Sequence, residues 1–225
     1  MRQRGTLMGK ITKLAILMIL MTACLAVPRA FALTYALDDG SGEYGVGYSG
    51  SPGGNLIWAN QFVVVPGANL ITAISVAFGP QYTTFTNLNG VSVTASLWSD
   101  PNGDGNPSDA VLLSSVVGTV ANYFTDVFNV YDIPDTVVAG SFFAAVSLSD
   151  PGSAYPARID QESVPTQSWY NTSTDLQNGS ANIWGGNWMI RAEGGPAAPV
   201  PEPATMLLLG SGLLGLWGAR KKFKK

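Results

Sequence analysis

The sequence predicts an all-β fold for residues 33–195, namely an antiparallel β-sandwich of jelly-roll type. Two observations lead to this prediction. Short runs rich in β-branched and aromatic residues follow one another, and clusters of Gly, Pro, Asn and Asp separate them at 51–54, 66–67, 89–90 and 150–152. No long amphipathic helical pattern interrupts the series. A segment of this length can bury its own core, so we expect one domain.

The expected strands are the apolar runs between these turns. In the first run, alternate residues from Leu56 to Val64 share one face, which Asn60 interrupts. Near the end of the domain, Trp188 alternates in phase with Ile190, which predicts that Trp188 is buried. The predicted strands cover residues 56–65, 70–78, 91–98, 111–120, 126–133, 137–148 and 188–191. Such a set is typical of two packed antiparallel sheets.

The first 32 residues have the three parts of a secretory signal peptide. A basic start is followed by the uncharged stretch 14–27, and Ala30 and Ala32 satisfy the A-x-A rule for signal peptidase after export through the Sec translocon. We therefore predict that residues 1–32 are removed. The alternative is a lipoprotein box ending at Cys24. Cleavage after Ala32 discards this cysteine, the only one, and leaves the mature chain without thiol chemistry.

Charge is distributed very unevenly along the chain. Ten of the twelve basic residues lie in the signal peptide or at the C-terminal end, and only Arg158 and Arg191 lie between them. Residues 33–195 hold these two arginines and fourteen of the fifteen acids, which gives the domain a net charge of -12. So acidic a surface repels nucleic acid and anionic lipid. The charge therefore argues strongly against nucleic-acid binding and against attachment of the domain to a membrane surface, whereas cations and neutral glycans are plausible partners.

The C-terminal segment predicts a short membrane anchor. A Pro-rich linker, 196–203, precedes the uncharged, mostly apolar stretch 204–219 and the basic end 220–225. A helix of sixteen residues rises about 1.5 Å per residue and only marginally spans a hydrocarbon core about 30 Å thick. The basic end is expected in the cytoplasm by the positive-inside rule, which places the acidic domain in the periplasm.

Val200, Pro201, Glu202 and Pro203, followed by this short helix and basic end, resemble the PEP-CTERM sorting signal of Gram-negative bacteria. The resemblance implies that an exosortase-type membrane peptidase cuts near these residues and passes the protein to the cell surface or medium, toward the exopolysaccharide. The membrane anchor would then be transient. An ordinary single-pass anchor is the alternative.

The segment 100–105 reads Asp-Pro-Asn-Gly-Asp-Gly, which matches the opening of a calcium-binding loop. The EF-hand interpretation fails, because loop position 12 is Val111 and no helix-forming sequence flanks the loop. A non-helical loop could still bind Ca²⁺ and act as a calcium-stabilised structural module. The same residue types also serve ordinary turns, so both interpretations stay open. The candidate ligands are Asp100, Asn102, Asp104 and Asp109.

Two further residue sets bear on function. Trp169, Tyr170 and Trp184 could stack on sugar rings, although core packing is the commoner role of such residues.

The chain has no histidine, which excludes His-dependent triads and His-ligated zinc. A secreted carbohydrate-active enzyme would need two facing carboxylates, for which the candidates are Glu43, Glu162 and Glu193. The leading hypothesis is a non-enzymatic surface or matrix protein associated with exopolysaccharide.

Overall fold

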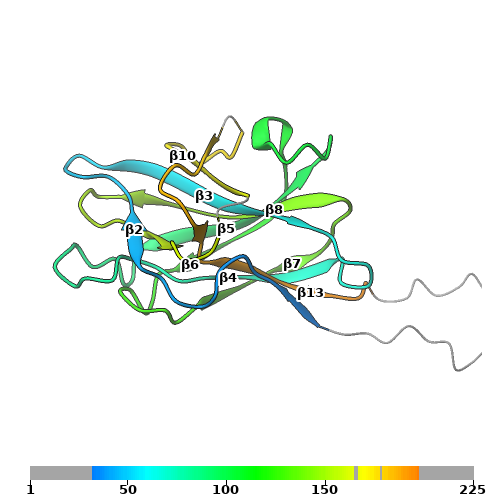
Figure 1. Cartoon of the computed structure of the whole chain (residues 1–225), viewed down its shortest axis with the longest axis horizontal. Helices are drawn as coiled ribbons and strands as arrows, with labels where there is room; N and C mark the ends of the chain where they lie inside the picture. The colour runs from blue at the N-terminus through cyan, green and yellow to red at the C-terminus, as the bar shows by residue number, and fades with distance from the viewer. Residues whose placement is uncertain (1–31, 165–166, 178, 198–225) are drawn as a thin grey trace, which may run out of the picture. The chain divides into compact units, whose positions relative to one another are not determined.

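A computed structural model of the protein describes residues 32–164, 167–177 and 179–197, and they form an all-β domain (Figure 1). The sorting tail 200–225 and all of the expected signal peptide except Ala32 lie outside these residues. Within them, no helix is long and apolar enough to cross a membrane. The elements are β1 (Leu33–Tyr35), β2 (Tyr44–Val46), β3 (Gly54–Val63), β4 (Leu70–Val76), β5 (Ser92–Asp100), the 3₁₀ turn η1 (Pro107–Asp109), β6 (Val111–Thr119), β7 (Asn129–Val137), β8 (Ser141–Asp150), β9 (Ala157–Asp160), β10 (Ser168–Asn171), β11 (Ser180–Ala181), β12 (Asn187–Trp188) and β13 (Ile190–Gly195).

The strands form two large antiparallel sheets and one small one. The four-stranded sheet has the order β1-β13-β4-β7, and the six-stranded sheet has the order β11-β10-β3-β8-β5-β6. If the eight strands β1, β3–β8 and β13 are counted in chain order, the sheets read 1-8-3-6 and 2-7-4-5, which is the strand order of a jelly roll. The predicted β-sandwich is confirmed. The third sheet is small and has three strands in the order β12-β9-β2.

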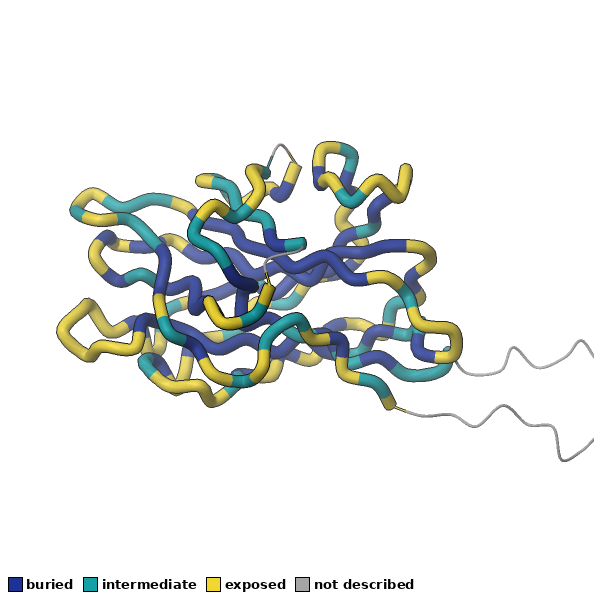
Figure 2. Tube along the Cα trace, in the orientation of Figure 1, coloured by how far each residue is buried: buried dark blue, intermediate teal, exposed yellow. Residues whose placement is uncertain are grey.

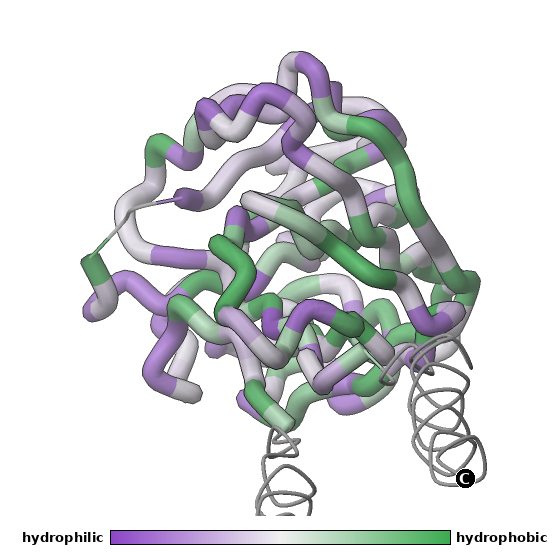
Figure 3. The backbone as a smooth tube through the Cα atoms, turned by 90° about the vertical axis from the view of Figure 1, so that its right-hand side faces the viewer, coloured by the Kyte–Doolittle hydropathy of each residue, from purple (hydrophilic) through white to green (hydrophobic). Residues whose placement is uncertain are grey.

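The main core lies between the two large sheets. Trp58, Phe78, Phe142 and Trp188 are fully buried there, as the sequence predicted for Trp188. Figure 2 shows the buried strand interiors and the exposed connections, and Figure 3 shows hydrophobic and hydrophilic residues alternating along the backbone. Each large apolar side chain buried in this way contributes about 1.5–3 kcal/mol to folding. The core therefore stabilises a domain that has no cysteine between residues 32 and 197.

Asn60 does not interrupt the core as its sequence position suggested. It is fully buried, and its Nδ2 donates to the backbone oxygens of Trp188 at 2.7 Å and Ile190 at 3.1 Å. Its Oδ1 accepts a hydrogen bond from Ser168 Oγ at 2.7 Å. Between β12 and β13 the chain passes at Met189 from the small sheet to the four-stranded sheet. Asn60 thus satisfies carbonyl groups that this change of sheet leaves without strand partners.

Several strand boundaries differ from the prediction. The expected strands 126–133 and 137–148 are β7 and β8, which begin three and four residues later. Gly140 separates them with a φ of +68°, a conformation that glycine adopts without strain. The run 188–191 is divided between β12 and β13. The unpredicted strands β1, β2, β9, β10 and β11 have two to four residues each, too few to show an alternating pattern.

Candidate functional site

The acidic loop after β5 is anchored by Asp100, which is buried at the end of that strand. Its Oδ2 accepts hydrogen bonds from Ser141 Oγ at 2.7 Å and from Gln61 Nε2 at 3.2 Å. The backbone amides of Gly103 and Gly105 donate to the same carboxylate. Asp100 thereby ties the loop to β3 and β8 as well as to its own strand.

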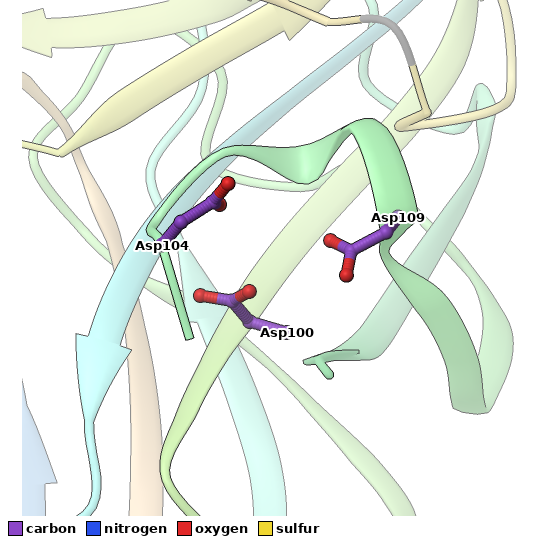
Figure 4. Close-up of side chains that lie close together, drawn as sticks. All are labelled: Asp100, Asp104 and Asp109. Carbon is purple, nitrogen blue, oxygen red and sulfur yellow. The ribbon is translucent and has the colours of Figure 1, made fainter. Parts of the chain in front are cut away.

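The loop brings three of the predicted ligands together. One carboxylate oxygen from each of Asp100, Asp104 and Asp109 lies within 4.8 Å of the others, and Figure 4 shows the three side chains around a common centre. Asp109 Oδ2 accepts a hydrogen bond from the backbone N–H of Asn102 at 3.2 Å. Asp109 Oδ1 is buried and has no hydrogen-bond partner in the described part of the chain. Three hard oxygen donors at this spacing suit Ca²⁺.

The fourth predicted ligand, Asn102, has another role in this geometry. Its Oδ1 accepts the backbone N–H of Asp104 at 2.9 Å, and its Nδ2 donates to Asp104 Oδ2 at 3.1 Å. Asp104 Oδ1 in turn accepts the N–H of Asn106, and Asn106 Oδ1 accepts the N–H of Ser108. These short-range bonds stabilise the turn by themselves. Turn chemistry therefore explains much of the motif, but not the unpartnered oxygen of Asp109.

The three aromatic candidates do not form one surface. Trp169 and Tyr170 are neighbours in β10, so their side chains lie on opposite faces of the sheet. Trp169 packs with the small cluster on the outer face, whereas Tyr170 and Trp184 pack against the main core. The rings of Tyr170 and Trp184 are 4.8 Å apart, and Trp184 lies 6.0 Å from the ring of Trp188. All three candidates are partly buried.

The outer face of the six-stranded sheet carries a groove of about 360 Å³. Its lining includes alternate residues of β5 together with residues of β6, one residue of β8 and the segment after β10. Trp98 is held there by a hydrogen bond of 2.9 Å from its Nε1 to Ser96 Oγ. We call it the hydroxyl groove after its prominent lining residues: Thr94, Ser96, Trp98, Ser115, Ser147 and Asp175.

A second pocket, of about 220 Å³, was missed by the sequence analysis. Its residues come from β2, from the β4–β5 connection and from the β8–β9 connection, which are far apart in sequence and show no shared motif. Only the exposed tyrosines could have given a signal, and single exposed aromatics are common. We call it the aromatic pocket, and its prominent lining residues are Glu43, Tyr44, Gln81, Tyr82, Phe85 and Tyr155.

The glutamates considered for catalysis occupy different surroundings. Glu43 lines the aromatic pocket, where it accepts hydrogen bonds from the backbone N–H of Gln161 and from Ser41 Oγ. Glu193 lies on β13 and accepts a hydrogen bond from Thr34 Oγ1 at 2.8 Å. Glu162 is exposed just after β9. Of these three, Glu43 alone lines either of the two pockets described above.

Both arginines of the described segment are paired with carboxylates. Arg158 is buried and its Nε lies 2.7 Å from an oxygen of Asp126. Arg191 lies 2.5 Å from Asp38 Oδ1 and places its guanidinium 4.1 Å from the centre of the Phe128 ring. Lysine is absent from residues 32–197. The described surface therefore offers no unpaired cationic side chain to an anionic ligand.

Comparison with known protein families identifies the C-terminal segment. The PEP-CTERM protein-sorting motif matches residues 199–222, which include Val200, Pro201, Glu202 and Pro203. The resemblance seen in the sequence is thus confirmed, although these residues lie outside those that the structure describes. The motif supports an exported protein with a membrane-anchored sorting signal that is targeted to an exosortase. No curated protein matches the chain.

Proposed function

We propose that this chain, which carries a PEP-CTERM sorting motif at residues 199–222, is a non-enzymatic protein of the cell surface or extracellular matrix. Its jelly-roll domain associates with exopolysaccharide after an exosortase has removed the tail. The sorting motif is the observation that carries this proposal. Signal peptidase and the Sec translocon act earlier, at the N-terminal signal.

The two pockets support a binding role over a catalytic one. A glycosidase of the common type needs two carboxyl groups on either side of the bond that it cleaves. The hydroxyl groove is lined by one carboxylate, that of Asp175, and the aromatic pocket by one, that of Glu43. The pockets instead present hydroxyl groups and aromatic rings, which can bind a sugar without catalysing a reaction on it. The carbohydrate-active enzyme therefore stays the weaker alternative.

The charge of the domain restricts the kind of polysaccharide. Both described arginines are paired, and the segment 33–195 has a net charge of -12. An anionic chain would be repelled unless a bound cation compensated for that charge. Association through hydrogen bonds and aromatic contacts with an uncharged glycan meets no such barrier.

Deletion of residues 200–225 tests the sorting role. The full chain and the truncated chain are expressed in the producing bacterium, and the periplasm, the outer surface, the medium and the isolated exopolysaccharide are analysed by immunoblot. We expect the full chain in the surface and exopolysaccharide fractions and the truncated chain in the periplasm. Glu162→Gln, a change at an exposed position of the domain, is the control and leaves the distribution unchanged.

The same fractionation in a strain that makes no exopolysaccharide tests the association. The processed protein is expected to move from the cell-bound fraction to the medium. An unchanged distribution of the truncated chain contradicts the sorting proposal. An unchanged distribution in the polysaccharide-free strain contradicts the association.

A calcium-stabilised structural module is the second candidate. The specific observation in its favour is the buried Oδ1 of Asp109, which lacks a hydrogen-bond partner beside two other carboxylates. A bound Ca²⁺ would satisfy this oxygen and offset the repulsion among the three acids. Because Asp100 contacts residues of β3 and β8, the ion would also fasten the loop to the sheet.

A further inference from the structure

We infer that the aromatic pocket binds one sugar ring that carries no negative charge, such as a neutral hexose or an N-acetylhexosamine. The inference rests on the proposed association with exopolysaccharide and names the site and the chemical class for it. The pocket has a volume of about 220 Å³, which is below the roughly 300–1,000 Å³ of sites for drug-sized ligands. It therefore suits a single ring or the end of a glycan chain.

The walls of the pocket present aromatic surface to solvent. Tyr44 is 48% exposed and Tyr82 is 64% exposed, although both belong to a residue type that usually buries its ring. The rings of Phe85 and Tyr155 meet edge to face, with their centres 4.8 Å apart. Exposed rings around a concavity offer flat apolar faces on which the C–H face of a sugar can stack.

The tyrosine hydroxyls of the pocket are available to a ligand. Within the described residues, those of Tyr44, Tyr82 and Tyr155 form no hydrogen bond to the protein. Elsewhere in the domain tyrosine hydroxyls stabilise the fold by donating to backbone oxygens, and this is true of Tyr35, Tyr48, Tyr123 and Tyr131. The pocket thus combines stacking surface with unused donors and acceptors, which is the combination that a polyhydroxylated ligand needs.

The pocket is held in shape by its backbone. The N–H of Thr86 donates to the oxygen of Ser153 at 3.1 Å, which joins the β4–β5 connection to the β8–β9 connection. A Cβ at Gly45 would lie 2.8 Å from the backbone of Pro80, so glycine permits β2 to approach these loops. Tyr155 has a φ of +58°, an uncommon conformation for a bulky residue. Such pre-organisation lowers the entropic cost of binding.

The charge of the pocket selects against acidic sugars. Glu43 is the only ionisable acid or base among its lining residues apart from the tyrosines, and its carboxylate is fixed by the N–H of Gln161 at 2.8 Å. No arginine or lysine lines the pocket. A uronic acid or phosphorylated sugar would meet this carboxylate without a compensating cation, whereas a neutral ring can donate its hydroxyls to it.

The position of the pocket fits a role at the surface. The segment 80–85 follows the C-terminal end of β4, whereas Gly195, from which the chain leaves toward the sorting tail, pairs with Leu70 at the other end of that strand. Seven residues of β-strand span roughly 23 Å. The pocket therefore opens at the end of β4 remote from the point at which the tail leaves the described domain.

Titration calorimetry on the processed protein, purified from the medium or surface fraction, tests the inference. The probes are cellohexaose, chitohexaose and an oligogalacturonate of the same length. We expect binding of at least one of the two uncharged hexasaccharides and none of the oligogalacturonate. Tyr82→Ala and Tyr44→Ala are each expected to weaken binding at least tenfold, because each removes an exposed ring. Val130→Ala, at an exposed site on β7 of the four-stranded sheet and outside the pocket, is the control and should bind like the parent.

Thermal unfolding of each variant checks the fold, and each is expected to melt like the parent. The inference is overturned if neither uncharged probe binds, if the oligogalacturonate binds best, or if both tyrosine variants bind like the parent. The proposed function fails separately. If the parent and both tyrosine variants remain with the exopolysaccharide equally well, the pocket inference alone is contradicted. If the pocket binds sugar but the protein never reaches the surface, the sorting role alone is contradicted.

Discussion

Leu33 lies directly opposite Gly194 in the antiparallel pair of β1 and β13. The residue expected to begin the mature chain is therefore paired with the strand that leads to the sorting tail. Two residues later, Tyr35 is buried, and its hydroxyl donates to the oxygen of Ala68 at 3.0 Å. Because β1 has only three residues, the position of signal cleavage decides whether this edge of the four-stranded sheet is complete.

The first prediction concerns the mature N-terminus. Mass spectrometry of the protein from intact cells and medium should find Leu33 as the first residue, because small residues at Ala30 and Ala32 fit signal peptidase. Ala32→Leu should block this cleavage and leave the uncut precursor, while Ala36→Leu, beyond the site, should not. A mature chain that begins with a lipid-modified Cys24 would contradict the prediction.

The second prediction concerns calcium. The melting temperature of the processed protein should rise when Ca²⁺ is added and fall when a chelator removes it, because an ion bound only to the folded state stabilises it. At a free concentration one hundred times the dissociation constant, the gain is about 2.7 kcal/mol. Asp104→Ala should abolish the response, because it removes one of the three converging carboxylates. Asp132→Ala, at an exposed acid on β7, should retain it. Equal melting temperatures with calcium and with chelator would rule out the site.

The third prediction concerns Arg158, whose buried guanidinium joins three parts of the chain. It donates to the backbone oxygens of Gly79 and Gly42, each at 2.9 Å, and to Asp126 at 2.7 Å. Arg158→Met should lower the free energy of unfolding by about 3 kcal/mol, because it leaves buried carbonyl groups without partners. Asp126→Asn should cost about 1 kcal/mol, since that side chain is half exposed and keeps an acceptor oxygen. Urea unfolding measures both, and equal losses for the two variants would contradict this account.

The sequence was sufficient for the fold class because turn residues bound long runs of apolar residues and no helical pattern interrupts the series. In β5, the core-facing residues Val93, Ala95 and Leu97 recur at every second position, and in β3 Leu56, Trp58 and Phe62 keep the same period except at Asn60, so the period of two can be recognised without a structure. The pattern could not show that Asn60 belongs inside, because its partners at Trp188 and Ile190 lie about 130 residues away. The two-residue strands β11 and β12 could not be predicted as separate strands, because only their pairing with other strands defines them.

The candidate sites also differ in whether their residues lie close together in the sequence. The three aspartates of the acidic loop lie within ten residues, so local sequence could predict that they converge. The aromatic pocket joins Tyr44, Tyr82 and Tyr155, which only the packing of β2 against two connections brings together. The separation of Trp169 from Tyr170 follows from strand geometry. It could have been predicted once 168–171 was known to be a strand.

The last prediction concerns acid stability and rests on Asp160, which is fully buried at the end of β9. Burial by itself raises the pKa of this carboxyl, but hydrogen bonds from the Ser163 hydroxyl and from the amides of Asp39, Ser163 and Glu162 outweigh it and lower the pKa below its ordinary value. A pKa lower in the folded than in the unfolded state means that the ionised form stabilises the fold. This contribution is complete above the unfolded-state pKa of about 4 and is lost as the pH falls through the lower pKa of the folded state.

Asp160→Asn should therefore destabilise the protein most at neutral pH. An amide offers one acceptor oxygen, and its NH₂ group opposes the N–H donors that now surround the carboxylate. Urea unfolding at pH 7, 4 and 3 should show the difference between parent and variant shrinking as the pH falls, because the parent alone loses the ionised group. Asp132→Asn, at an exposed acid, should follow the parent at every pH. A difference for Asp160→Asn that stays constant from pH 7 to pH 3 would mean that this carboxylate stabilises the fold by its shape and not by its charge.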